Sequence, residues 1–236
     1  MFFNKAAEDT SLGYGELHSI RIVHFCGDVY WITIEGVDVF VARNISDIEH
    51  AFDRLRGSPV VGCDTETSGL TAKYGKLFSI QFSDGSFNVL IPISEGVAIG
   101  KLAEILTDLN VIKIFHNAKF DLEFLSAIDI TPRNIFDTMV AEKVLTRGAN
   151  QSSSLAETLY RYFAVDLDKS QRTKFIRKWN GIWTDELVAY ALSDVVHLPR
   201  LMSEQNAWLE KLGLTAEYAT QMNKVITSDG RPDALL

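Results

Sequence analysis

Hydrophobic and polar positions along the chain predict short strands followed by alternating strands and helices. Three β-rich runs, residues 20–25, 29–34 and 37–42, are separated by Cys-Gly-Asp and Glu-Gly and predict a small meander. A helix is then expected over 46–56, with Ser46 as its N-cap. A fully apolar strand over 59–64 follows and ends in a carboxylate.

The same alternation continues to the last third of the chain. Asp84-Gly85 between two strand-like runs is a strong hairpin signal. Thr184 is the expected cap of a last long helix, which Pro199 should kink or split. The other expected elements are strands at 77–83, 86–91, 111–115 and near 135, and helices at 97–106, 117–128, 137–146 and 154–164.

These elements predict one α/β domain with additions at both ends. We expect an N-terminal arm and β meander over 1–45, the main domain over 46–211 and a C-terminal tail over 212–236, where the periodic pattern is lost. The meander has two candidate roles, capping a sheet edge or self-association. The oligomeric state is left undecided.

Composition excludes several classes of protein. The 236 residues are 47% hydrophobic and 23% charged, which excludes wholesale disorder, collagen and coiled coil. No stretch approaches the roughly 18 apolar residues of a membrane span. Two cysteines, Cys26 and Cys63, lie in apolar runs and are expected to be buried free thiols. Without a secretory signal, a reducing cytoplasm is the expected location.

Candidate chemistry begins with two carboxylates at the end of the apolar strand. Asp64 and Glu66 lie two residues apart, so on a strand their side chains point the same way. Ligand sites in open α/β sheets lie at the ends of such buried strands. A similar pair, Asp47 and Glu49, falls on a helix, where positions two apart do not face each other, and is expected on the surface.

Three further residues extend this set. Asp121 follows a second apolar strand and lies one turn into a helix, in His-Asn-Ala-Lys-Phe-Asp. Tyr190 and Asp194 are four residues apart on a late helix and therefore share a face. The order is a strand Asp-x-Glu, then Asn-x-x-x-Asp on a helix, then Tyr-x-x-x-Asp on a later helix.

These three motifs resemble those of the DEDD 3′–5′ exonucleases, in the tyrosine-bearing branch that includes the DNA polymerase I proofreading domain and RNase D. The resemblance covers about residues 59–208. It implies a ribonuclease H-like mixed sheet flanked by helices. It also implies that Asp64, Glu66, Asp121, Tyr190 and Asp194 are catalytic. Position 189 is alanine, whereas the other branch carries a histidine five residues before the last Asp.

The resemblance assigns the four carboxylates to two Mg²⁺ or Mn²⁺ ions. Asp64 would bridge both ions, Glu66 and Asp194 would complete one site, and Asp121 would hold the second ion largely through water. Carboxylate oxygens without clustered His or Cys suit these ions and not zinc. Tyr190 would orient the attacking water, because a phenol with an ordinary pKa of about 10 is a better positioner than base.

Substrate contacts are expected from two regions. Thr65, Leu70 and Asn117 belong to the first two motifs, where Leu70 would wedge against the terminal base and Asn117 would contact the strand or cap its helix. His116 and Asp137 are expected to be structural, Asp137 as a helix cap. Residues 169–184 carry five basic residues, no acidic one and interleaved aromatics including Trp179 and Trp183. Lysine and arginine there could pair with phosphates while the aromatics stack on bases, with Lys169, Arg172 and Phe175 as the candidate contacts. The alternative is a solvated helix whose aromatics lie in the core.

The sequence therefore predicts a 3′–5′ exonuclease that acts on single-stranded 3′ ends, with DNA slightly favoured over RNA, and releases nucleoside 5′-monophosphates. Two alternatives stay in view, a hydrolase of di- to penta-nucleotides and a catalytically silent nucleic-acid-binding module. The net charge of −8 argues against a general polyelectrolyte binder. Bound metal ions and the local basicity of the stretch described above would reconcile this negative net charge with nucleic-acid binding.

Overall fold

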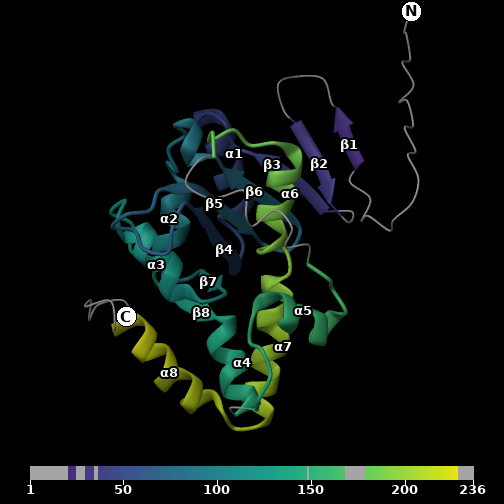
Figure 1. Ribbon diagram of the computed structural model, residues 1–236, viewed down its shortest axis with the longest axis vertical. Coiled ribbons are helices and arrows are strands. Elements are labelled where there is room, and N and C mark those ends of the chain that lie inside the picture. Colours follow the sequence, from purple (N-terminus) through teal and green to yellow (C-terminus); the bar gives the residue numbers. More distant parts are fainter. Residues whose placement is uncertain (1–20, 25–29, 35–36, 148, 168–178, 228–236) are drawn as a thin grey trace, which may run out of the picture.

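A computed structural model describes residues 21–24, 30–34, 37–147, 149–167 and 179–227. Its centre is one eight-stranded sheet with the strand order β1-β2-β3-β6-β5-β4-β7-β8 (Figure 1). The strands are β1 (Arg21–His24), β2 (Tyr30–Ile34), β3 (Val37–Val41), β4 (Val60–Thr67), β5 (Leu77–Ser83), β6 (Phe87–Ile91), β7 (Ile112–Phe115) and β8 (Ile135–Asp137).

Parallel and antiparallel pairs are mixed in this sheet. Strands β4, β5 and β6 form an antiparallel meander, while β7 and β8 add to β4 in parallel. The predicted hairpin is confirmed, because β5 and β6 meet at Asp84-Gly85 and Gly85 has a φ of 90°. Asp84 fixes this turn by accepting the backbone N–H of Ser86 and of Phe87.

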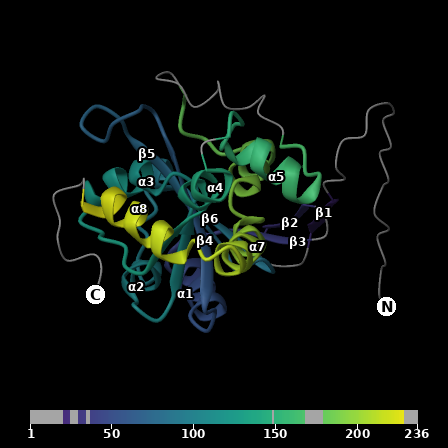
Figure 2. The same cartoon turned by 90° about the horizontal axis from the view of Figure 1, so that it is seen from below.

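Helices cover both faces of the sheet (Figures 1 and 2). One core lies beneath α1, α2 and α3, and the other beneath α4 to α8. The central strands are therefore buried on both sides, as the apolar sequence at the start of β4 predicts. The helices are α1 (Ile45–Leu55), α2 (Leu102–Thr107), α3 (Ala118–Ser126), α4 (Thr138–Thr146), α5 (Leu155–Phe163), α6 (Asp185–Ser193), α7 (Leu198–Lys211) and α8 (Thr215–Thr227).

Two helix boundaries differ from prediction and one agrees. The cap of α1 is Asn44, whose side chain accepts the Asp47 N–H, so the prediction of Ser46 as the cap was wrong. The helix expected over 97–106 begins only at Leu102. Thr184 caps α6 as predicted, and the predicted long helix is split into α6 and α7, with Pro199 at the start of α7.

Two described segments near the ends of the chain, β1–β3 and α8, are more integrated with the main domain than the sequence suggested. Strand β3 pairs in parallel with β6, so the N-terminal meander continues the main sheet at its edge. Part of the expected tail is helix α8, which buries Tyr218, Met222 and Ile226. The prediction of a patternless tail was therefore wrong for 215–227. These side chains recur every fourth residue among polar ones, a stripe too narrow to stand out in the sequence.

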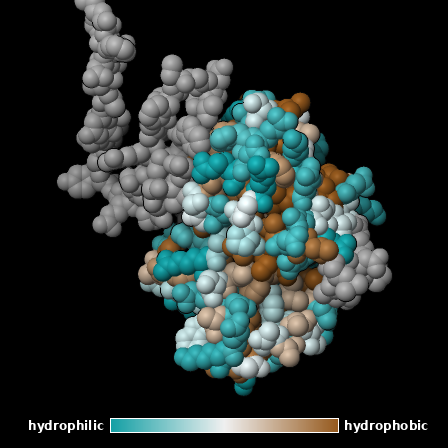
Figure 3. Space-filling model, turned by 180° about the vertical axis from the view of Figure 1, so that it is seen from behind, coloured by the Kyte–Doolittle hydropathy of each residue, from teal (hydrophilic) through white to brown (hydrophobic). Residues whose placement is uncertain are grey.

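Hydrophilic side chains dominate the visible surface. The side opposite to that of Figure 1 carries mainly hydrophilic residues with apolar ones between them (Figure 3). No helix in the described ranges combines the length and apolarity needed to cross a bilayer.

Candidate active site

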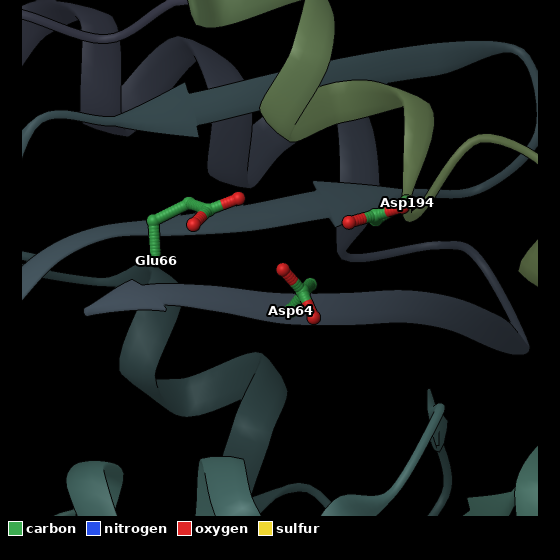
Figure 4. Close-up of side chains that lie close together, drawn as sticks. All are labelled: Asp64, Glu66 and Asp194. Atoms are coloured by element: carbon green, nitrogen blue, oxygen red, sulfur yellow. The ribbon is translucent and has the colours of Figure 1, made fainter. Parts of the chain in front are cut away.

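Three carboxylates from two distant segments converge on one face of the sheet. Asp64 and Glu66 project from β4, and Asp194 follows the last residue of α6 (Figure 4). One oxygen of each lies within 4.8 Å of the others, and all three residues are half-buried. The structure thus brings together three of the four acids predicted to bind metal.

A glycine on β4 allows this convergence. Gly62 lies two residues before Asp64 and so faces the same side of the sheet. A Cβ at this position would lie 2.9 Å from the carbonyl oxygen of Val195 and 3.0 Å from Cβ of Leu198. Only a residue without a side chain lets the α6–α7 junction approach β4 this closely. Asp194 is the neighbour of Val195, so this approach carries its carboxylate over Asp64.

The electrostatics of this group suit a bound cation. Burial, together with the negative charges of Asp121, Asp194 and Glu66, raises the pKa of the Asp64 carboxyl well above its ordinary value. Carboxylates that face one another repel unless a proton or a cation lies between them. Hard divalent cations such as Mg²⁺ and Mn²⁺ take oxygen ligands of this kind. The residues present therefore fit a divalent metal.

Asp121 lies beside this group and has its own partner. It sits in the first turn of α3 with 2% of its surface exposed. Thr65 Oγ1 donates to Asp121 Oδ1 over 2.7 Å. Burial raises the pKa of Asp121 to about 7, although the Thr65 hydrogen bond lowers it. Thr65 was expected to contact substrate, but its side chain is buried and directed at Asp121. In the structure, the contact made by the Thr65 side chain is therefore with Asp121.

Tyr190 lies on α6, one helical turn before Asp194, as the spacing predicts. Its side chain is half-buried and packs against the core beneath α4 to α8. The catalytic role expected for Tyr190 stays a prediction.

Asn117 occupies an unusual position between β7 and α3. Its φ of 72° is left-handed, its side chain is exposed, and that side chain makes no capping bond to α3. The capping role considered for Asn117 is therefore absent. The amide is free of the helix terminus and faces solvent, which is compatible with a contact to substrate.

Asp137 joins the starts of two helices. Its carboxylate accepts the N–H groups of Met139 and Val140 and so caps α4, as predicted. The same carboxylate accepts the N–H groups of Asn117 and Ala118 at the start of α3. Asp137 thus fixes the helix that carries Asp121. Nearby, His116 Nδ1 lies 2.8 Å from Thr138 Oγ1, as expected of a structural histidine.

Leu70 lies on the loop between β4 and β5 with 85% of its surface exposed. The loop is anchored to α3, because Glu123 Oε1 accepts the N–H of Ala72 over 2.8 Å. Gly75 packs closely on the ring of Phe124. An exposed apolar side chain on an anchored loop is compatible with the expected wedge. No local pattern singles out Glu123, since its pairing with the loop spans 51 positions.

The basic stretch is only partly described. Lys169, Arg172 and Phe175 lie outside the described residues. Trp183 was expected to stack on bases, but it is 4% exposed and its indole N–H donates to Ser94. Trp179 packs edge-on against Phe78 with ring centroids 4.7 Å apart. Trp183 is therefore a core residue, which contradicts base stacking by this side chain and agrees with the alternative that the aromatics lie in the core.

A buried polar pair beneath the site was missed. Gln81 and Ser79 on β5 pair directly with Asp64 and Glu66 and are fully buried. The Gln81 amide donates to Ser79 Oγ over 2.6 Å. Directly paired residues on antiparallel strands share a face, so this pair borders the carboxylates. The signal was present as alternating polar positions in a strand that is otherwise apolar.

Comparison with known proteins places the chain in a family. Residues 39–207 match the family described as 3′-5′ exonuclease. Ribonuclease D of Jannaschia sp. is 32% identical over 184 residues, covering 75% of this chain and 46% of the relative. DNA polymerase I of Aquifex aeolicus is 28% identical over 182 residues, covering 77% of this chain and 29% of the relative. The chain thus spans about half or less of the length of these curated relatives.

A solved structure shares both the fold and most of its length with this chain. Brucella melitensis NrnC bound to pGG is 27% identical with a TM-score of 0.68, and the match covers 80% of this chain and 89% of that one. The same protein with bound Mg²⁺ gives 26% and 0.66. The sheet flanked by helices is the expected ribonuclease H-like fold. The chain belongs to the 3′–5′ exonuclease family, a family of hydrolytic nucleases.

Proposed function

We propose that this protein is a two-metal-ion 3′–5′ exonuclease that hydrolyses single-stranded nucleic acid from its 3′ end and releases nucleoside 5′-monophosphates. The observation that carries the proposal is the convergence of Asp64, Glu66 and Asp194 within 4.8 Å on one face of the sheet. A catalytically silent binding module would not need these acids, nor Asp121 and Tyr190 beside them.

The metal ions would be Mg²⁺ or Mn²⁺, held by Asp64, Glu66 and Asp194, with Asp121 contributing to the second ion. When bound, such ions supply a nucleophile at neutral pH and neutralise charge on the leaving oxygen. The buried hydrogen bond from Thr65 would keep Asp121 in one orientation. Gly62 would hold Asp194 against β4, so that the site is preformed.

The remaining residues would orient the reactants. The hydroxyl of Tyr190 would hydrogen-bond the attacking water and aim it at the terminal phosphodiester. Leu70, exposed on its anchored loop, would pack against the terminal base. The exposed amide of Asn117 would contact the nucleic-acid strand one nucleotide inward from its 3′ end. Correct placement of reactants contributes much of the acceleration in such sites.

RNA is the better supported substrate. The Jannaschia relative and several further curated relatives are named Ribonuclease D, which outweighs the slight preference for DNA drawn from the motifs. We also propose that the protein acts in a reducing cytoplasm. The buried free thiol of Cys63 is consistent with that setting.

A second candidate function is the hydrolysis of very short oligonucleotides. It is favoured by the similarity to Brucella melitensis NrnC in complex with pGG, of which this chain covers 89%. Both candidates share the same chemistry and differ in substrate length.

The test is a parallel digest of 5′-labelled RNA, DNA, duplex and dinucleotides. We expect single strands to shorten one nucleotide at a time with Mg²⁺ or Mn²⁺, and EDTA to abolish the reaction. Asp64→Ala should remove activity and leave the fold intact, whereas Asp53→Ala, on the surface of α1, should keep activity. Degradation from the 5′ end, or full activity of Asp64→Ala, would overturn the proposal. Binding without hydrolysis of any substrate would favour the silent module.

A further inference from the structure

A groove of about 840 Å³ lies between α4 and α8 and reaches the first turn of α3. Helix α8 lies alongside α3 and α4 (Figure 2). Valines of α4 and α8 line part of the groove, and Glu217 is its one carboxylate. Its cations are Lys119, Lys143, Arg147 and Lys224.

The groove is strongly basic within an acidic protein. Four cations face one carboxylate here, although the whole chain carries a net charge of −8. All four cations are exposed, and none forms an ion pair with a carboxylate of the described residues. Lys143 lies in the last turn of α4 and Arg147 is the C-cap of that helix, so two of the four cations stand at the same helix end. Uncompensated like charges around one groove fit a polyanion.

Hydrogen bonds tie the groove to the carboxylate site. Lys119 lies between Asn117 and Asp121 in the first turn of α3. The Asp137 carboxylate holds the start of this helix and caps α4. The Asp137 N–H donates to the hydroxyl of Tyr218 on α8 over 2.9 Å. The three walls of the groove therefore meet at Asp137, and their positions are fixed relative to Asp121.

We propose that this groove binds the phosphates of a single strand upstream of the 3′ end that lies in the carboxylate site. The proposal rests on the proposed function and extends it to strand length. Lysine and arginine pair with phosphates, and an apolar floor accommodates bases or sugars. A dinucleotide held at the site would not need the groove. The groove therefore favours longer strands as substrates.

The test compares substrate lengths in a charge-reversal variant. Lys143→Glu with Lys224→Glu reverses two exposed cations of the groove. The control, Arg56→Glu with Lys101→Glu, reverses two exposed, ion-paired cations at the end of α1 and the start of α2. For RNA of roughly 12 nucleotides, we expect the groove variant to raise KM roughly tenfold. The slope of log affinity against log salt should become shallower by about 0.7 for each phosphate that the variant no longer neutralises. Hydrolysis of pGG should be unchanged, and the control variant should match the parent on both substrates.

Several outcomes separate this proposal from the proposed function. An unchanged KM and salt dependence on the long strand would overturn the groove proposal, with nuclease activity intact. An equal loss on pGG and on the long strand would also overturn it, because the effect would then lie in the carboxylate site. If the parent hydrolyses neither substrate, the proposed function fails, and fluorescence anisotropy of the labelled strand still tests the groove. Weakened binding of poly-L-glutamate with unchanged strand binding would indicate an acidic protein partner instead.

Discussion

Tyr218→Phe tests whether α8 is an integral part of the domain. The Tyr218 hydroxyl accepts the backbone N–H of Asp137 over 2.9 Å, and both residues are buried. The substitution keeps the ring, which packs against Phe136 with centroids 4.9 Å apart. It removes only the acceptor and leaves a buried N–H without a partner. Such a loss costs about 1–3 kcal/mol of the free energy of unfolding.

Urea unfolding of the full chain, followed by circular dichroism, measures this cost. With a slope near the upper end of about 1–3 kcal/mol per molar urea, the midpoint should fall by roughly 0.3–1 M. Tyr160→Phe is the matched control, because Tyr160 is 60% exposed on α5. We expect the control to change stability by less than about 0.5 kcal/mol. Equal midpoints for the two variants would show that the bond between α8 and Asp137 contributes nothing, and the reasoning would fail.

Two further predictions concern the loop at the site and a buried lysine. Glu123→Ala removes the acceptor for the Ala72 N–H, so we expect faster amide exchange in residues 68–76 and a roughly tenfold lower kcat/KM. Glu123→Gln keeps an acceptor and should preserve both the exchange rate and kcat/KM. Unchanged amide exchange in Glu123→Ala would contradict the anchoring role of Glu123. Burial lowers the pKa of Lys113 to about 8. Between about pH 8 and 10.4 the Lys113 amine is then protonated in the unfolded chain but not in the folded chain. The free energy of unfolding of the parent should therefore rise with pH relative to that of Lys113→Met, by at most about 1.4 kcal/mol per pH unit. A flat difference in urea unfolding across this range would argue against a depressed pKa.

Local patterns predicted the elements that carry the site. The two-residue period of a strand placed Asp64 and Glu66 on one face, and the four-residue spacing of a helix did the same for Tyr190 and Asp194. The hairpin at Asp84-Gly85 followed from turn chemistry alone. These features depend only on residues close together in the sequence, so the sequence alone is enough to identify them.

Helix α8 shows where local reasoning stops. Its buried residues, Tyr218, Met222 and Ile226, form a narrow stripe in a polar segment. The stripe can be recognised as a buried face only when it is seen against α4 and the N–H of Asp137. Asp137 lies 81 positions before Tyr218 in the sequence. Trp183 shows the converse, because an aromatic residue beside basic ones suggests base stacking until Ser94 and the core are seen around it.

The sequence by itself determined the family motifs, the strands and helices that bear them, and the acidic chemistry of the site. Tertiary structure alone decided that Asp194 reaches Asp64, because the contact requires Gly62 to admit the α6–α7 junction. It also decided that the Thr65 hydroxyl donates a hydrogen bond to Asp121 and that cations from α3, α4 and α8 line one groove. The physical reason is that strand and helix periods fix the direction of a side chain relative to its own backbone. Which groups meet is set by packing between elements far apart in the chain.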